Sequence, residues 1–239
     1  MWNCRRNKAD TSKKRFKPLR KFLLVALGFI FIRTMFLNYN HVPTQSMNPN
    51  LHEGDVILVN KVAYNFKLPF AETGLLNFGS PERGDIVTFD YNGVNYVKRI
   101  MAVGGDTFKM TDNRFYINDK KLPLNHTRNE SVDLNEFKTQ EEYTYKAYRE
   151  ENFSGLQYDV IYAEGFKEDY IKKMIVSSEV YVVPEDTYFM IGDNRNMSGD
   201  SRYIGAIHMD KITGKVVKIA FNNQQIFTDV KMRFWEDTE

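Results

Sequence analysis

One serine and one lysine of the chain stand in settings that suit nucleophilic catalysis. Ser46 lies in the sequence VPTQSM, a short polar turn just beyond an apolar segment. A serine hydroxyl becomes a strong nucleophile only when a nearby base takes its proton. Lys98 lies in the sequence NYVKRIMAV, where a strand's period of two gives it tyrosine, isoleucine and alanine as neighbours on the same face. This apolar setting makes Lys98 a candidate base for Ser46.

Burial would give Lys98 the protonation state that a base needs. Free lysine has a pKa near 10.4, so only about 0.04% is the neutral amine at pH 7. An apolar site lowers the pKa by several units, and a drop of about three units costs roughly 4 kcal/mol. Such an amine is a usable base near neutral pH. The alternative is an edge-strand or snorkelling lysine, and the sequence alone leaves both open.

Histidines are the other candidate bases for Ser46. His41 and His52 flank the serine, but neither stands in a G-x-S-x-G nucleophile elbow, and His208 has no evident orienting partner beside it. Members of a triad need only meet in space, so a histidine base also stays open. The four scattered histidines and the single cysteine, Cys4, lack metal-ligand spacing, so we predict no metal or other cofactor.

A polar loop with alternating charges is suited to position the lysine. The sequence GDNRNMSGDSR, residues 192–202, contains Ser198, whose hydroxyl can hold the Lys98 amine by a hydrogen bond. Acidic and basic residues alternate along this loop: Asp193, Arg195, Asp200 and Arg202. Paired Asp and Arg side chains would brace the loop, whereas an unpaired aspartate near Lys98 would raise the lysine pKa. The alternative is a solvated turn with weak surface ion pairs.

The N-terminal part of the chain predicts a membrane anchor. Residues 1–21 carry nine Lys or Arg against one acid, and residues 22–37 are apolar apart from Arg33. Sixteen helical residues rise about 24 Å, a little less than a hydrocarbon core of roughly 30 Å. A cleaved signal peptide would end in small residues, and a core helix would not need the basic head, so we favour an uncleaved anchor. The positive-inside rule then places residues 1–21 in the cytoplasm and the chain after about residue 38 outside it.

Beyond the anchor the sequence predicts a mainly β domain. Short runs rich in β-branched and aromatic residues end at Gly, Pro, Asn or Asp, as strands do. They lie at 54–64, 84–91, 95–103, 115–119, 179–184, 187–192 and 211–221, with a hairpin turn at Asn118 and Asp119. Residues 125–178 are polar and acidic, with helix-compatible pieces at 134–151 and 166–175. We therefore predict a smaller inserted α+β subdomain between two parts of a β core, 38–124 and 179–239. This body is mildly acidic, which argues against nucleic-acid binding.

Four sequence blocks resemble one family. They are PTQSMNPNLHEGD, RGDIVTF, YVKRIMAVGGD and GDNRNMSGDSRYIG, and in this order behind an apolar segment they are similar to the motifs of bacterial type I signal peptidases. These are membrane-bound serine peptidases with a Ser/Lys dyad and a twisted all-β catalytic core that carries a smaller insertion. The resemblance implies that Ser46 is the nucleophile, Lys98 the general base and Ser198 the residue that orients the lysine. Thr44 stands where the family places a hydroxyl in the oxyanion hole.

The resemblance also implies roles for supporting residues. The family's shallow pockets for small side chains fall on Val42, Met47, Leu51, Tyr96 and Val97. Its structural ion pairs fall on Arg99, Asp193, Asp200 and Arg202. Gln45 replaces the small residue that is usual before the nucleophile, which bears on how a substrate backbone approaches.

The implied reaction is the removal of signal peptides from secretory preproteins, with the catalytic domain on the outer face of the bacterial cytoplasmic membrane. Ser46 lies nine residues after Leu37 and so within about 32 Å of the membrane surface, which suits a substrate delivered from the bilayer. One alternative is a dedicated maturation peptidase of a conjugation or pilus system with the same chemistry. Another is a non-enzymatic anchored β domain that binds envelope proteins. The preferred preproteins and the oligomeric state stay open at this point.

Overall fold

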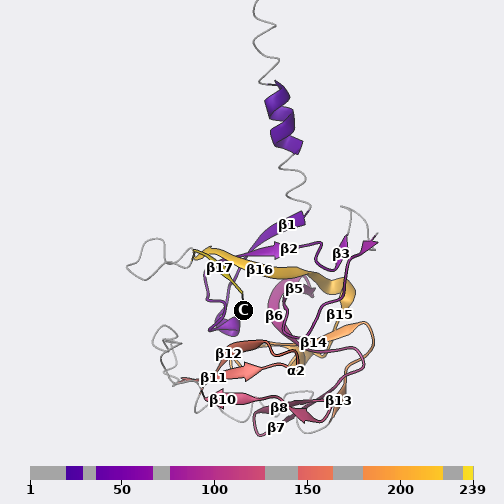
Figure 1. Ribbon diagram of the computed structural model, residues 1–239, viewed down its shortest axis with the longest axis vertical. Coiled ribbons are helices and arrows are strands. Elements are labelled where there is room, and N and C mark those ends of the chain that lie inside the picture. The colour runs from indigo at the N-terminus through magenta and orange to yellow at the C-terminus, as the bar shows by residue number, and fades with distance from the viewer. Residues whose placement is uncertain are drawn as a thin grey trace, which may run out of the picture.

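The chain folds into a mainly β protein, shown as a computed structural model in Figure 1. The structure describes residues 20–28, 36–66, 76–126, 145–163, 180–222 and 234–238. The largest sheet contains, in spatial order, β1 (Leu37–His41), β2 (Asp55–Asn60), β16 (Ile212–Asn222), β5 (Ile86–Tyr91), β6 (Val94–Val103), β14 (Thr187–Ile191) and β15 (Ile207–His208), and β17 (Phe234–Asp237) pairs with β16. The predicted β core is therefore confirmed.

Three smaller sheets accompany the largest one. They are β10 (Leu124–His126), β11 (Tyr145–Glu151) and β12 (Gln157–Ala163); β13 (Tyr181–Val182), β7 (Thr107–Thr111), β8 (Arg114–Ile117) and β9 (Lys120–Lys121); and β3 (Asn65–Phe66) with β4 (Leu76–Asn77). Helical turns occur at η1 (Gln45–Met47), α2 (Ser201–Ile204) and η4 (Met209–Lys211). The predicted hairpin turn is confirmed, because Asn118 and Asp119 both adopt positive φ between the paired strands β8 and β9.

Strand β6 lies in the interior of the largest sheet and carries the candidate base. It pairs antiparallel with β5 on one side and with β14 on the other. All residues from Val97 to Ala102 are buried, so both faces of the strand are covered. Val97 packs in one hydrophobic cluster and Ile100 in a different one. The side chain of Lys98 is consequently buried, whichever face of the strand it projects from.

The predicted N-terminal anchor falls only partly within the described residues. Residues 20–28 are helical, whereas Leu37 begins strand β1, so the apolar segment predicted for 22–37 ends before this leucine. Within the described ranges, the structure contains no helix of the length and apolar character that a membrane crossing requires. The basic head up to residue 19 and the segment 29–35 lie outside these ranges.

The predicted insertion 125–178 contributes a β-hairpin in its described part. β11 and β12 pair antiparallel over seven residue pairs, from Tyr145 opposite Ala163 to Glu151 opposite Gln157. The helix-compatible interpretation of 134–151 is therefore wrong for its last seven residues. Helix-forming Lys, Glu and Arg are abundant there, but pairing with β12 and burial of Tyr145, Ala147 and Glu150 override that preference. Residues 134–144 and 166–175 lie outside the described part of the chain.

Candidate active site

Ser46 and Lys98 meet in a buried contact between the η1 turn and strand β6. Lys98 Nζ donates a hydrogen bond to Ser46 Oγ at 2.6 Å and another to the Val97 carbonyl oxygen at 2.9 Å. The two residues are 8% and 3% exposed, so bulk water has little access to either. Two of the candidate histidines contact other groups: His52 lies 3.0 Å from the Pro49 carbonyl oxygen, and His208 lies 2.9 Å from Asp210. Lys98 is thus the base candidate in direct contact with the serine.

Burial gives the Lys98 amine a pKa suited to proton transfer. Loss of hydration is the main cause, and it lowers the pKa of Lys98 from 10.5 to about 8. The negative charges of Asp200 and Asp193 oppose this shift, and the positive charge of Arg202 adds to it. At pH 7 an amine with such a pKa is about 9% neutral, about 200 times more than free lysine. The amine can therefore accept the serine proton without a histidine.

Thr44 places a second hydroxyl beside the serine oxygen. It occupies the position just before η1 with an extended backbone, where a threonine side chain usually caps the turn. Its side chain makes no such cap, and its Oγ1 instead donates to Ser46 Oγ at 3.2 Å. A hydroxyl in this place is close to any oxyanion that forms when the serine attacks a carbonyl.

One loop contacts both the strand of Lys98 and the turn of Ser46, the candidate base and nucleophile. We call residues 192–202 the catalytic loop. Arg99, next to the lysine on β6, donates from Nε and Nη2 to both oxygens of Asp193 at 3.0 and 2.9 Å. The following residue, Asn194, donates from its backbone to the Ser46 carbonyl at 3.1 Å and from its side chain to the Gln45 carbonyl at 3.2 Å. Two consecutive loop residues therefore fix the strand of the base against the turn of the nucleophile.

Gly192 allows the catalytic loop to approach the nucleophile turn closely. A Cβ at this position would lie under 3.0 Å from both the Ser46 carbonyl oxygen and Ser198 Oγ, closer than real Cβ contacts.

Ser198 is buried beside Gly192, but the Lys98 amine donates its two hydrogen bonds to Ser46 and to the Val97 carbonyl oxygen. The Ser198 hydroxyl has no well-aligned partner among the described residues, but it lies close enough to Asp200 to help lower that carboxyl's pKa. The predicted hydrogen bond between Ser198 and Lys98 is thus not formed in this structure.

The residues predicted to form ion pairs lie in buried pairs around the dyad. Arg99 pairs with Asp193, and Arg202 donates from Nε and Nη2 to the two oxygens of Asp200, each at 2.8 Å. Asp200 also accepts from the backbone of Gly192 at 3.1 Å. Burial raises the pKa of Asp200, but Arg202 outweighs it and holds the pKa below its usual range. Each carboxylate near the lysine is therefore balanced by an arginine.

A third buried ion pair was missed by sequence reasoning. Arg195 of the catalytic loop pairs with Glu150 at 2.6 Å, and both side chains are almost fully buried. Arg195 stands in a recognised block, but Glu150 lies in the insertion, in a run of charged residues where nothing distinguishes it from its neighbours. Glu150 is buried because of where β11 lies in the folded protein, and the local sequence around Glu150 does not indicate this.

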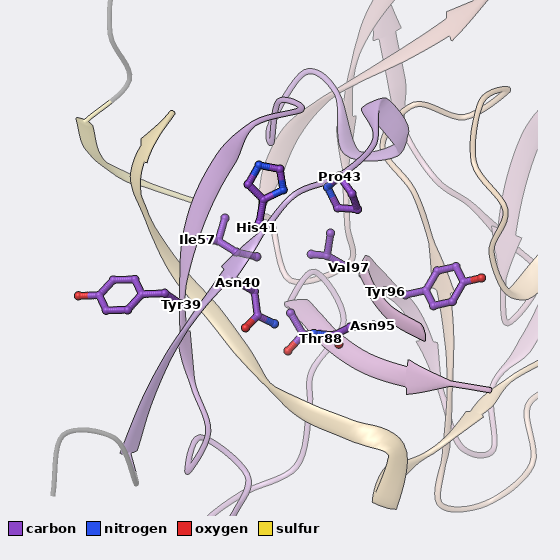
Figure 2. Close-up of a pocket in the computed structure, with 9 residues that line it drawn as sticks. All are labelled: Tyr39, Asn40, His41, Pro43, Ile57, Thr88, Asn95, Tyr96 and Val97. Atoms are coloured by element: carbon purple, nitrogen blue, oxygen red, sulfur yellow. The ribbon is translucent and has the colours of Figure 1, made fainter. Parts of the chain in front are cut away.

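A groove of about 280 Å³ lies between β1 and the β5–β6 pair, and it adjoins the dyad at Val97, whose carbonyl accepts a hydrogen bond from Lys98. Its lining comprises Tyr39, Asn40, His41, Pro43, Ile57, Thr88, Asn95, Tyr96 and Val97 (Figure 2). Tyr39 and Tyr96 point away from each other at its two sides, while Asn40 points toward Thr88 (Figure 2). Of the predicted pocket residues, Tyr96 and Val97 lie in this groove. The others, Val42, Met47 and Leu51, are fully buried in a hydrophobic cluster that includes Val97.

A buried serine in contact with a lysine of lowered pKa is the arrangement of serine hydrolases that use lysine as the base. Comparison with known families matches residues 16–221 to the family described as signal peptidase, peptidase S26. The match spans most of the chain, so the chain belongs to this family.

Individual relatives carry the same description. A signal peptidase I of Buchnera aphidicola is 29% identical over 239 residues, covering 87% of this chain and 77% of that protein. A signal peptidase I of Pseudomonas aeruginosa is 30% identical over 188 residues, covering 77% of this chain and 61% of that protein. A solved signal peptidase I structure from Enterococcus faecalis is 26% identical, and the match covers 57% of this chain and 96% of that one with a TM-score of 0.34.

Proposed function

We propose that the protein is a membrane-bound serine endopeptidase that removes signal peptides from secretory preproteins, with Ser46 as nucleophile and Lys98 as general base. The observation that carries the proposal is the hydrogen bond of 2.6 Å between the two side chains, together with a lysine pKa of about 8. The family match agrees with this reaction. No metal or cofactor is required for this chemistry, because the amine itself activates the serine.

Each group has a role in a two-step hydrolysis. Neutral Lys98 takes the proton of Ser46 as Oγ attacks the peptide carbonyl, and the resulting oxyanion lies near the Thr44 hydroxyl and the Ser46 backbone N–H. The ammonium then gives its proton to the leaving amine, which departs and leaves an acyl-enzyme on Ser46. Water deprotonated by Lys98 hydrolyses the ester and restores the free serine. The deep burial of the amine keeps it deprotonated often enough to start each cycle.

The groove beside the dyad is suited to an extended peptide. Among the described strands, β1 is the first in the order of the largest sheet, so an extended peptide could be added beside it as a further strand, as in β-augmentation. Side chains of an extended peptide alternate, so two residues of an A-x-A sequence would face the protein together. Val97 and Ile57 give the groove an apolar wall of modest size, which fits small side chains. The substrate's cleavage site would then lie at Ser46.

An anchor that begins at residue 22 and ends before Leu37 would hold this site close to its substrate. The helix at 20–28 agrees with its beginning, and the basic head before it favours a cytoplasmic N-terminus. The catalytic domain would then lie on the outer face of the cytoplasmic membrane, where a translocated preprotein still has its signal peptide in the bilayer.

The deciding experiment compares the purified wild-type chain with Ser46→Ala on a reporter preprotein in detergent. Cleavage at the signal-peptide junction by the wild type, and none by the variant, is the expected result. A specialised conjugation or pilus precursor in a parallel reaction separates a general enzyme from a dedicated maturation peptidase. If neither substrate is cut by the wild type, a non-enzymatic binding domain becomes the better interpretation.

A further inference from the structure

A buried ion pair outside the recognised motifs connects the β11–β12 hairpin to the catalytic loop. Arg195 Nη1 and Nη2 donate to the two oxygens of Glu150 at 2.6 and 2.7 Å, and Tyr158 OH donates to the same carboxylate at 2.6 Å. Both charged side chains are at most 2% exposed. A buried ion pair usually stabilises a fold no more than well-packed apolar residues of similar size would. The presence of this pair therefore indicates that it fixes the catalytic loop in one position rather than adding stability.

The hairpin also holds the backbone of the catalytic loop. Ile161 of β12 donates its N–H to the Asp193 carbonyl at 3.1 Å and accepts from the Arg195 N–H at 2.9 Å. Two residues further along β12, Ala163 donates its N–H to the Asn196 side chain at 3.1 Å. The loop segment 193–196 is thus added to β12 like a short parallel strand. The position of this segment depends on where the hairpin lies.

The same segment determines how the two reacting groups meet. Asn194, between the two loop residues held by β12, binds the carbonyls of Gln45 and Ser46. On the other side, the ring of Tyr158 lies 3.9 Å under the guanidinium of Arg99, which neighbours the base on β6. The hairpin therefore contacts the supports of both the nucleophile and the base.

We propose that Glu150 is a positioning residue for the Ser46–Lys98 pair. Its carboxylate, delivered by the β11–β12 hairpin, fixes Arg195 and with it the loop segment 193–196 that sets the distance between the hydroxyl and the amine. The inference deepens the proposed function and rests on it only for assays with a peptide substrate. It assigns a part in the reaction to the insertion, which none of the recognised sequence blocks reaches.

The test removes one charge with little change of shape. Glu150→Gln leaves Arg195 without its anionic partner, so the loop segment loses its fixed position. The matched control is Arg149→Gln, which also removes one charge from β11 but breaks the pair with Asp159, where the arginine is 45% exposed. Both variants are measured as full-length protein well below their unfolding midpoints. The readouts are kcat and KM for preprotein cleavage, and the rate at which a small acylating reagent modifies Ser46 without any peptide.

The expected result is a fall of about 100-fold in kcat and in the acylation rate for Glu150→Gln, because misplacement by about 1 Å has effects of this size. KM should change little, since Glu150 does not line the groove, and the control should behave like the wild type. A folded Glu150→Gln with wild-type acylation and kcat would overturn the proposal, as would an equal loss in the control.

A second variant covers the case in which Glu150→Gln does not fold. Tyr158→Phe removes one hydrogen bond to the Glu150 carboxylate and keeps the ring under Arg99. It should lower kcat and the acylation rate together by a smaller factor, and unchanged rates would refute the positioning role. If wild-type Ser46 reacts with the small reagent but no preprotein is cut, the proposed function fails while the comparison of acylation rates still decides this inference.

Discussion

The pH dependence of cleavage should report the pKa of Lys98 directly. With a pKa of about 8, the neutral fraction of the amine rises from about 1% at pH 6 to about 9% at pH 7 and about 90% at pH 9. Because only the neutral amine takes the serine proton, kcat/KM should rise about ninefold from pH 6 to pH 7, about fivefold from pH 7 to pH 8, and level off above pH 9. The total gain between pH 6 and pH 9 is then about 90-fold.

The assay follows the initial rate on a peptide that contains a signal-peptide junction and no group that titrates in this range. kcat/KM is the quantity to plot, since it reports the pKa values of the free enzyme. His41→Gln serves as the control, because His41 is exposed and lines the groove beside the dyad. The control should keep the midpoint near 8.

Two outcomes would refute this reasoning. A rise centred near pH 6.5 that vanishes in His41→Gln would assign the base to a histidine, whose ordinary pKa is about 6.5. A rate that still climbs about sevenfold between pH 9 and pH 10 would mean that the lysine retains its ordinary pKa near 10.4 and is not desolvated as the structure indicates. Either result would remove Lys98 from the role of a partly neutral base.

Three further predictions concern single residues. Thr44→Ala should lower kcat by about 100- to 1,000-fold, the usual effect of losing one oxyanion donor, while Thr44→Ser should stay close to the wild type; unchanged turnover in the alanine variant would exclude Thr44 from the oxyanion hole. Lys98→Met should raise the free energy of unfolding at pH 7 by up to about 3 kcal/mol, because burial of Lys98 lowers its pKa and this costs the wild type stability wherever the unfolded lysine is charged. The gain should fade between pH 8 and 10.5, where the unfolded lysine also loses its proton. Urea unfolding of both proteins at pH 8 and at pH 10.5 measures this, and an equal difference at the two pH values would contradict the prediction. Gly192→Ala should lower kcat about 100-fold by displacing the Ser46 carbonyl, whereas Gly199→Ala, with open space around its Cβ, should not; similar kcat values for both would disprove the close approach.

The β character of the core was predictable from local patterns, and the insertion was not. β5 and β6 fall within or next to the runs predicted at 84–91 and 95–103, because β-branched and aromatic residues bounded by turn formers specify strands locally. β11 has the opposite composition, with Lys, Arg and Glu between aromatic residues, and its strand state depends on pairing with β12. Such pairing is a tertiary contact and leaves no periodic signal in β11 alone.

The candidate site was predictable where chemistry restricts the residue type. A serine in a polar turn and a lysine among apolar neighbours are unusual enough to be singled out from the sequence, and the structure brings them into contact. Glu150 had no such signal, because a glutamate in a charged strand is ordinary until Arg195, 45 residues later in the sequence, is placed against it. Gly192 was also missed, since its closeness to the nucleophile turn appears only in three dimensions.

The balance of buried charges explains how a lysine surrounded by ions can still lose its proton. Asp193 and Asp200 both act to raise the Lys98 pKa, and either carboxylate left alone would favour the ammonium. Each is instead held by two hydrogen bonds from an arginine, and the positive charge of Arg202 also acts on the amine and lowers its pKa. Desolvation exceeds the opposing influence of the two carboxylates, so the pKa of Lys98 falls. Arg202 therefore bears on the lysine pKa as well as on the loop, whose Arg195 carbonyl it also binds.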